Sequence, residues 1–351
     1  MTQEPEVLIR RIGRAGRITL NRPKALNALG LAMVREIWAA LLAWKDDPTI
    51  HHIVLDGTGG RALCAGGDVR WLYDGRVEGS KHARAFWTEE YRLNALIGSY
   101  PKPFIPLMDG IVMGGGIGLS AHSTGLRVVT ERSRLAMPET SIGLIPDVGG
   151  TWLLAKAPAE SGVYLGLLGE QFGAADAIYA GFADWHVPSG RLSELTVALE
   201  ADPRPALEIV GGFATSPGDA PLSGEKKAII SACFRHDSVE AILTALKSTG
   251  GAIAEKALAD LATRSPKSLR MTLAAIRNAH HLPSLARALE IEYRLCVRMF
   301  EDGEFIEGVR AAIVDKDRSP KWRPATLAEV TPEVVAHYLG PLPAGEDIVV
   351  G

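Results

Sequence analysis

Cysteine is scarce in this chain of 351 residues, and its three copies are not arranged as ligands or disulfide partners. Cys64, Cys233 and Cys296 are far apart, and none belongs to a Cys-x-x-Cys pair. Neither a disulfide framework nor a zinc ribbon is expected, and a reducing compartment such as the cytoplasm is the predicted location. The nine histidines form no metal-binding pattern, so no metal site is expected; His51 and His52, beside a predicted strand, are expected at the surface.

Long apolar runs are also missing. No stretch of 18 apolar residues occurs, and the N-terminus, MTQEPEVLIRR, is polar and acidic early on, with neither an apolar stretch of signal-peptide length nor transit-peptide character. We therefore expect no membrane span and no targeting segment. Charge of one sign is lacking too, because 38 basic and 41 acidic residues give a net charge of −3. This balance provides no electrostatic footprint for nucleic acid or an anionic membrane.

What the chain does contain is an alternation of strand-like and helix-like patterns. Apolar residues make up 47% of the sequence, enough for a sizeable core. Short β-type runs alternate with helical periodicity, which predicts an α/β fold with crossover connections; the runs are 7–12, 17–20, 53–55, 104–108, 126–130, 135–137 and 183–187. The pattern is helical over 165–180. Beyond residue 200 it is nearly all helical, over 205–213, 224–234, 237–246, 251–263, 266–278, 283–301, 305–314 and 332–339. We expect a core over 1–200 and a helical region over 201–351.

Two glycine clusters stand out as candidate sites. Gly114-Gly115-Gly116 follows a predicted strand and opens a predicted helix, where several N–H groups meet the positive end of the helix dipole. Such a site suits an anion or a developing oxyanion, although close packing of the helix start explains the glycines equally well. The second cluster is Cys64-Ala65-Gly66-Gly67-Asp68, a turn in which Asp68 is suited to cap the next segment. The two clusters become informative together only if they converge.

Several strings resemble the crotonase (enoyl-CoA hydratase/isomerase) superfamily, and they occur in family order. They are ITLNRPKALNAL at 18–29, LCAGGD at 63–68, DGIVMGGG at 109–116, MPE at 137–139 and IGLIPDVGGT at 142–151. The resemblance implies a crotonase-like fold of repeated ββα units, with a helical C-terminal region that completes the active site or makes oligomer contacts. It implies an acyl-CoA substrate and no separate cofactor, since coenzyme A is part of the substrate. A homo-oligomer, a trimer or hexamer in relatives, is the expected partner state.

Within this superfamily the chain is most similar to the branch that hydrolyses short β-hydroxyacyl-CoA thioesters. Gly118 stands where a typical hydratase has a glutamate, and Asp147 stands where many relatives have glycine. The segments 292–294, 305–311, 315–317 and 320–322 resemble the longer tail of that branch. The resemblance therefore implies hydrolysis of 3-hydroxyisobutyryl-CoA, an intermediate of valine breakdown. An enoyl-CoA hydratase or isomerase is the enzymatic alternative, and a catalytically idle CoA-binding protein is the alternative of another class.

The resemblance also implies roles for individual residues. The backbone N–H groups of Gly67 and Gly115 would form an oxyanion hole, and Glu139 would act as nucleophile or general base. Asp147 would lie near the substrate hydroxyl and the reacting water, and Glu90 would belong to the same acidic pocket. The residues alone leave other readings open: Glu139 as a helix cap, Asp147 as a turn residue and Glu90 as an exposed helix residue.

The resemblance implies contacts to the substrate as well. Lys24 and Arg22 lie in the loop that meets coenzyme A in this family, although a lysine or arginine in an exposed proline loop is ordinarily only a solvated charge. From this loop, Lys24 and Ala25 are the expected contacts. Ala65 and Asp68 flank the first glycine turn, and Pro138 precedes the candidate catalytic glutamate. These five are the expected substrate-binding residues besides Glu90.

Overall fold

The computed structural model describes residues 4–123 and 125–350, and the chain divides into two compact units. The first unit comprises Met1–Asp68, Arg92–Leu135 and Gln171–Ala220. The second comprises Val69–Tyr91, Ala136–Glu170 and Pro221–Gly351. Each unit is thus assembled from separated stretches of sequence. From the sequence we expected one boundary, between residues 200 and 201, and that boundary stays a prediction.

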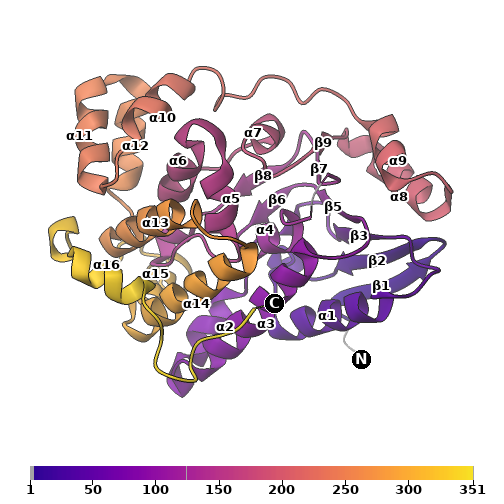
Figure 1. Cartoon of the computed structure of the whole chain (residues 1–351), viewed down its shortest axis with the longest axis horizontal. Coiled ribbons are helices and arrows are strands. Elements are labelled where there is room, and N and C mark those ends of the chain that lie inside the picture. The colour runs from indigo at the N-terminus through magenta and orange to yellow at the C-terminus, as the bar shows by residue number, and fades with distance from the viewer. Residues whose placement is uncertain (1–3, 124, 351) are drawn as a thin grey trace. The chain divides into compact units, whose positions relative to one another are not determined.

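The first unit is built on a six-stranded sheet in the order β1-β2-β3-β5-β7-β9 (Figure 1). β1 and β2 form an antiparallel hairpin, and each following neighbour pairs in parallel. The strands are β1 (Val7–Ile12), β2 (Ala15–Leu20), β3 (His52–Gly57), β5 (Phe104–Met108), β7 (Val128–Val129) and β9 (Trp185–His186). Parallel neighbours require crossovers, so the α/β class predicted from the alternating pattern is confirmed.

The central strands are apolar because helices cover them. All five residues of β5 are buried, which is typical of a parallel strand covered on both faces. The core of this unit joins β3, β5 and β7 to α8 (Leu192–Ala201) and α9 (Ala206–Phe213). On β2, a Cβ atom at Gly16 would lie 2.5 Å from Trp44 Cε3 of α1 (Leu31–Lys45). Only glycine permits α1 to pack so closely on this strand.

The expectation that His52 lies at the surface is wrong. This side chain is 4% exposed, and its Nε2 atom lies 2.8 Å from the carbonyl oxygen of Leu199. Leu199 belongs to the last turn of α8, where the backbone carbonyl groups have no N–H donor within the helix. His52 therefore provides a hydrogen-bond partner for a carbonyl group at the end of α8. Burial lowers the pKa of its imidazole.

A second, three-stranded sheet carries the glycine clusters. Its order is β4 (Ala62–Cys64), β6 (Ile111–Met113) and β8 (Arg134–Ala136). β4 and β6 were not predicted from the sequence, because three residues are too few to show a strand period. Both strands nevertheless end directly before a glycine turn, so this small sheet positions the candidate oxyanion site.

The second unit is helical, as the sequence predicted for the C-terminal part. Its helices are α2 (Val69–Asp74), the first part of α3 (Lys81–Gly98), α5 (Gly150–Lys156), α6 (Ser161–Leu168), α10 (Lys227–Cys233), α11 (Val239–Thr249), α12 (Gly251–Leu261), α13 (Pro266–Ala279), α14 (Leu285–Glu301), α15 (Glu304–Val309) and α16 (Pro332–Leu339). α13 and α14 begin at serine caps, Ser265 and Ser284, whose hydroxyls accept N–H groups of the first turn. The predicted spans 266–278 and 283–301 are confirmed to within two residues.

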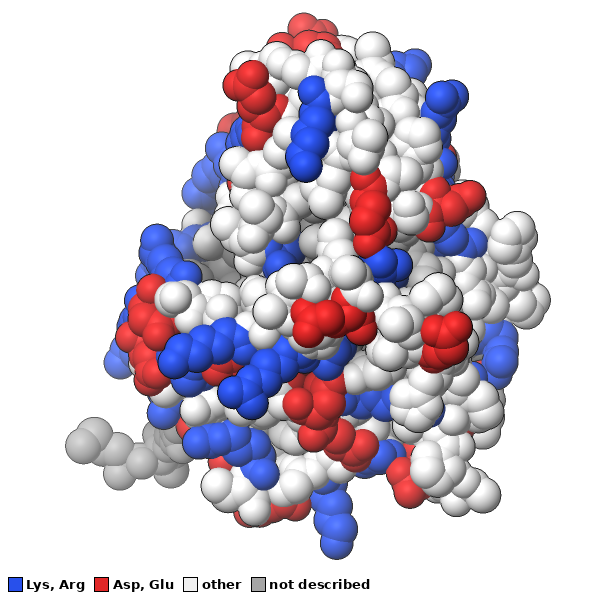
Figure 2. Space-filling view, turned by 90° about the vertical axis from the view of Figure 1, so that its left-hand side faces the viewer, with Lys and Arg blue, Asp and Glu red and all other residues white. Residues whose placement is uncertain are grey.

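Two predicted helices of this region differ in detail. The span 165–180 is split, because Gly169 adopts φ +64° and ends α6 before α7 (Ala174–Tyr179) begins in the first unit. The span 305–314 is α15 followed by a π-helical turn over Arg310–Val314. Figure 2 shows basic and acidic side chains interspersed over the face in view. Within the described ranges, no helix combines the length and apolar character that crossing a membrane requires.

Candidate active site

Two glycine turns of the first unit lie side by side at the ends of neighbouring parallel strands. β4 pairs with β6; the turn after β4 carries Gly66, and the turn after β6 leads into α4 (Gly115–Ser120). A Cβ atom on Gly66 would lie 4.0 Å from Gly115 N, and one on Gly116 would lie 2.3 Å from the carbonyl oxygen of Cys64. The turns therefore converge, and the close approach at position 116 requires glycine.

Each turn presents a backbone N–H group that has no acceptor in the described part of the chain. Leu29 bridges the first turn by donating to the oxygen of Gly66 at 2.8 Å and accepting from Asp68 N at 2.9 Å, so Gly67 N–H lies outside this ladder. Gly115 N–H belongs to the first turn of α4, where N–H groups lack a partner within the helix. Two such donors suit an oxygen atom that gains negative charge.

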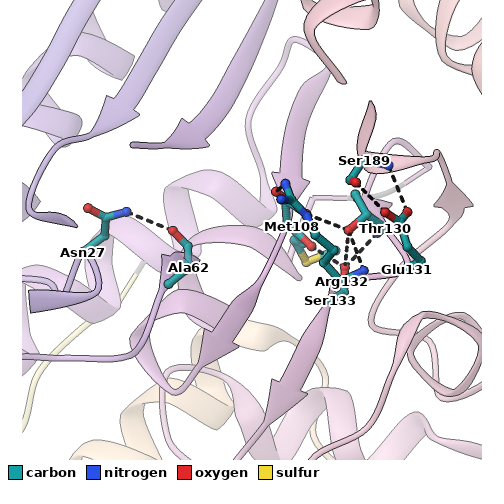
Figure 3. Close-up of polar contacts among 9 residues, drawn as sticks. Asn27, Ala62, Met108, Thr130, Glu131, Arg132, Ser133 and Ser189 are labelled. Carbon is teal, nitrogen blue, oxygen red and sulfur yellow. Dashed lines mark hydrogen bonds and ion pairs between the residues drawn. The ribbon is translucent and has the colours of Figure 1, made fainter. Parts of the chain in front are cut away.

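The loop after β2 is held against the start of β4 by Asn27, which is fully buried. Its Oδ1 accepts the N–H of Arg22 at 2.8 Å, and its Nδ2 donates to the carbonyl oxygen of Thr58 at 3.1 Å. Its Nδ2 also donates to the carbonyl oxygen of Ala62 at 2.9 Å, the contact drawn in Figure 3. Ala65 is half-buried, and its N–H donates to the same loop at 3.0 Å. These contacts explain why an asparagine stands in the LNRPKALNAL string.

The same loop carries the expected coenzyme A contacts. Lys24 and Ala25 lie on a short 3-10 helix, Pro23–Ala25, and are exposed. The neighbouring Arg22 is engaged within the protein: its guanidinium pairs with Glu6 at 2.9 Å and with Asp68 at 3.1 Å. The carboxylate of Asp68 therefore ties the first glycine turn to this loop. The Lys24 side chain is exposed to solvent.

On the other side of the small sheet, a polar network holds the segment that enters β6. Ser133 Oγ donates to the carbonyl oxygen of Met108 at 2.5 Å and accepts the N–H of Thr130 at 2.7 Å. Thr130 Oγ1 in turn donates to Asp109 Oδ1 at 2.7 Å. Figure 3 shows Thr130, Ser133 and Met108 in this network. Because Met108 and Asp109 lead into β6, the network fixes the approach to the second glycine turn.

The first unit also has a cavity of about 300 Å³, whose lining includes Ala62 and Leu63 of β4. Its charged lining is paired: Arg17 binds Asp56 at 2.6 Å, and Arg132 binds Asp109. None of the site residues expected from the sequence lines it. The glycine turns therefore remain the candidate site of the first unit.

In the second unit, Glu139 begins a 3-10 helix, Glu139–Ile142, and is 5% exposed. Two glycines allow other segments to press on its backbone. A Cβ atom on Gly308 of α15 would lie 2.2 Å from the carbonyl carbon of Ile142, and one on Gly169 would lie 2.8 Å from Cα of the half-buried Pro138. α15 and the end of α6 therefore fix the position of the Glu139 backbone.

Asp147 is held by side chains from two helices. Tyr91 of α3 donates its hydroxyl to Asp147 Oδ2 at 2.7 Å. Cys296 of α14 lies with its Sγ 3.8 Å from the same oxygen and 3.3 Å from Tyr91 Oη. The next residue, Val148, has φ +53°, a left-handed conformation that is strained for a β-branched residue. Asp147 thus sits at a strained turn with one carboxylate oxygen anchored.

Burial and mutual repulsion raise the pKa values of the acidic groups in this unit. Glu90, which is 2% exposed, and Glu139 both have pKa values raised well above the usual range, first by burial and next by the charge of Asp147. Burial raises the pKa of Asp147 to about 6, although the Tyr91 hydrogen bond opposes it. Burial also raises the pKa of Glu292 on α14 to about 8, against three hydrogen bonds from Thr151 and Gly149.

Two oxygens of this carboxyl cluster are buried without a hydrogen-bond partner in the described chain: Glu90 Oε1 and Glu139 Oε2. Unpaired buried polar atoms cost stability, so their retention points to a functional partner such as water or substrate. Clustered carboxyls with raised pKa values are suited to proton transfer near neutral pH. Among the described residues, no three His, Cys, Asp or Glu side chains are placed to hold a metal ion.

Comparison with known families identifies this arrangement. A family model described as "Enoyl-CoA hydratase/isomerase" matches residues 15–339. The chain belongs to the enoyl-CoA hydratase/isomerase family. Membership accounts for the paired glycine turns, and it confirms the resemblance and the crotonase-like fold expected from the sequence.

Relatives within this family are similar over nearly the whole chain. A protein of Rattus norvegicus named "3-hydroxyisobutyryl-CoA hydrolase, mitochondrial" is 42% identical over 96% of this chain and 89% of its own length. The protein of that name from Xenopus tropicalis is 41% identical with the same coverage of both chains. The Homo sapiens protein of that name is 40% identical over 93% of this chain and 86% of its own.

Solved structures in the family carry different names. One described as a carnitinyl-CoA dehydratase from Mycobacterium thermoresistibile is 44% identical, with a TM-score of 0.92 over 97% of this chain and 98% of that chain. One described as an enoyl-CoA hydratase from Rhodobacter sphaeroides 2.4.1 is 43% identical, with a TM-score of 0.90 over 98% and 99%. Names of relatives therefore point to both hydrolysis and hydration, and the residues of this chain must discriminate between them.

The discriminating position in this family member is Gly118. It is a buried residue of α4, and it supplies no carboxyl where the resemblance places the second glutamate of a hydratase. The structure gathers Gly67, Gly115, Ala65, Asp68, Lys24 and Ala25 in the first unit, and Glu90, Pro138, Glu139 and Asp147 in the second. Glu90 is buried and not exposed, as is Asp147, so neither is an ordinary surface residue.

Sequence reasoning missed three side chains around Asp147: Tyr91, Cys296 and Glu292. A signal for Glu292 was present, because it lies on the apolar face of a strongly amphipathic helix, between Leu289 and Cys296. A carboxyl at such a position must be paired or functional. Tyr91 offered no comparable signal, since an aromatic residue in a buried helix face is ordinary.

Proposed function

We propose that this protein hydrolyses 3-hydroxyisobutyryl-CoA to 3-hydroxyisobutyrate and coenzyme A. The observation that carries the proposal is a buried cluster in which Glu139 has Asp147 as its acidic companion, while position 118 bears no carboxyl. Hydration of an enoyl thioester in this family uses two glutamates around one water, and this chain keeps only one of them. The named hydrolases at about 40% identity support the same conclusion.

The glycine turns supply electrostatic stabilisation. Attack on the thioester carbonyl moves negative charge to its oxygen, and the N–H groups of Gly67 and Gly115 are donors suited to that charge. Each donor of this kind contributes about 3–4 kcal/mol to transition-state stabilisation. Backbone donors need no side chain, and glycine lets the acyl group approach closely.

Glu139 supplies the base or the nucleophile. As a base it takes a proton from water while the oxygen attacks the carbonyl carbon; the C–S bond then breaks and coenzyme A leaves as the thiol. As a nucleophile it forms an acyl anhydride, which water hydrolyses in a second step. Label from ¹⁸O-labelled water in the Glu139 carboxyl group after a single turnover would demonstrate the anhydride route with water attacking the glutamyl carbonyl, because the base route places no label there.

Asp147 and Glu90 serve the substrate's hydroxyl end in this proposal. Tyr91 donates to Asp147 Oδ2 and holds this carboxyl group in place, and we propose that its other oxygen accepts a hydrogen bond from the 3-hydroxyl or from the reacting water. Glu90 Oε1 is the second unpaired acceptor in the cluster. Lys24, Ala25, Ala65 and Asp68 are proposed to contact coenzyme A, as the resemblance implies.

The test incubates the protein with a panel of acyl-CoA substrates and measures two signals for each substrate. Release of free thiol reports hydrolysis, and loss of the enoyl absorbance without thiol release reports hydration. We expect rapid thiol release from 3-hydroxyisobutyryl-CoA and little change with crotonyl-CoA. The opposite pattern would support the hydratase named among the solved structures, and neither signal would support an idle CoA-binding protein.

A further inference from the structure

Glu292 is the most completely buried carboxyl group of the second unit, and the reaction as described does not use it. It lies on α14 and is 0% exposed. Its hydrogen-bond partners lie 141 or more residues earlier in the sequence. Its Oε2 accepts the N–H of Gly149 at 2.6 Å, and its Oε1 accepts the N–H of Thr151 at 2.9 Å and the Thr151 hydroxyl. A buried carboxyl with three donors performs a defined task in the fold.

That task is to cap a helix whose own sequence cannot do so. α5 begins at Gly150, and its N-cap residue, Gly149, has φ +79° and no side chain to accept N–H groups. Helix starts leave such groups unsatisfied unless a side chain, water or ligand accepts them. Glu292 provides the acceptor oxygens from another helix.

The capped residues directly follow Asp147. Val148 is held at φ +53°, and Gly150 N–H donates back to the carbonyl oxygen of Asp147 at 2.6 Å. A strained β-branched residue persists only where its surroundings over-determine the backbone. Glu292 accepts the N–H of Gly149, the residue after Val148. Tyr91 donates to the side chain of Asp147, the residue before it.

We propose that Glu292 is a positioning residue that fixes the Asp147–Gly149 turn, and thereby aims the Asp147 carboxyl group at the substrate hydroxyl. The aim toward the hydroxyl rests on the function proposed above, whereas the hold on the turn does not. Glu292 makes no contact with the reacting atoms in this account. Its effect on catalysis passes through Asp147.

The test uses Glu292→Gln, because an amide keeps the shape but has only one accepting oxygen for the two N–H groups. Glu290→Gln is the matched control: Glu290 lies two residues earlier on α14, is 8% exposed, and also accepts a backbone N–H, that of Val350 at 3.3 Å. We expect the crystal structure of Glu292→Gln to show a changed Val148 φ and a Tyr91–Asp147 distance longer than 2.7 Å. Both features should be unchanged in the control.

The kinetic readout is the ratio of kcat/KM for 3-hydroxyisobutyryl-CoA to that for isobutyryl-CoA, which lacks the hydroxyl. We expect Glu292→Gln to lower this ratio at least tenfold, and to lower it no further when Asp147→Asn is already present. An equal loss on both substrates, or multiplicative effects of the two substitutions, would show a merely structural role. If the unmodified protein hydrolyses neither thioester, the proposed function fails, and the crystal structures still decide whether Glu292 holds the turn.

Discussion

The hydroxyl of Tyr91 lies 2.7 Å from Asp147 Oδ2, inside the buried cluster, and both side chains are nearly inaccessible to solvent. A hydrogen bond to a carboxylate favours its ionised form, and it opposes the effect of burial on the pKa of Asp147. The relationship therefore sets both the orientation of Asp147 and its charge at neutral pH.

Replacing Tyr91 by phenylalanine removes this bond while keeping the ring. Hydrogen bonds to charged groups contribute about 1.5–3 kcal/mol, so we expect kcat/KM to fall by about 10- to 100-fold and the pKa of Asp147 to rise above about 6. The pH profile of kcat/KM measures both effects. Tyr100→Phe is the control, since that hydroxyl donates to the carbonyl oxygen of Leu41 in the first unit. A profile unchanged by Tyr91→Phe would exclude this role.

The pH dependence of activity provides a second test, through Asp147→Asn. The negative charge of Asp147 disfavours ionised Glu139 and raises the pKa of that carboxyl. Removing the charge lowers that pKa, so the base form exists at lower pH and the acid limb of the kcat/KM profile should move toward lower pH. The residual activity is expected to be low but measurable by thiol release. An acid limb that stays in place or moves upward would contradict the coupling between the two carboxyls.

The stability of the fold should also depend on pH through Glu292. Its pKa is about 8 in the folded chain, above the ordinary value near 4.5, so the folded state binds more protons than the unfolded state between these values. The free energy of unfolding should therefore fall as pH rises from about 4.5 to about 8. Glu292→Gln cannot titrate and should flatten this decline, measured by urea unfolding at pH 5 and pH 8. A decline equal to that of the unmodified protein would assign it to other groups.

Gly308 permits α15 to touch the 3-10 helix that carries Glu139. A Cβ atom there would lie 2.2 Å from the carbonyl carbon of Ile142, so Gly308→Ala should cost about 1–3 kcal/mol of stability and reduce kcat by displacing Glu139. Gly212→Ala, in α9, is the control because no neighbouring atom lies within 4 Å of its Cβ position. It should be neutral or stabilising by about 0.5–1 kcal/mol. Thermal unfolding and steady-state kinetics compare the two, and equal behaviour would remove the argument from close packing.

Much of the fold was predictable because its signals are local. The strand 104–108 and the helix 283–301 show their periods and boundaries within a few residues of sequence. His52 was misplaced because the helix carbonyl that it meets, in Leu199, lies 147 residues further along the chain. The three-residue strands β4 and β6 show no period at all, although the glycines that follow them were recognised.

The candidate site was predictable only in part, for a related reason. The motif strings pointed to Gly67, Gly115, Glu139 and Asp147 through a family resemblance. In the structure the two glycine turns converge, and the two carboxyl groups are buried. The residues that tune Asp147 come from α3 and α14, 56 and 149 positions away for Tyr91 and Cys296, and no local pattern links them to it.

The central claim is that the Glu139 carboxyl group performs the hydrolysis, and Glu139→Gln tests it most directly. The amide keeps the size of the side chain but provides neither a base nor a nucleophile. We expect thiol release from 3-hydroxyisobutyryl-CoA to be nearly abolished, while circular dichroism and the thermal unfolding transition show an intact fold. Retention of more than about a tenth of the unmodified kcat, equivalent to a barrier change below about 1.4 kcal/mol, would contradict the account.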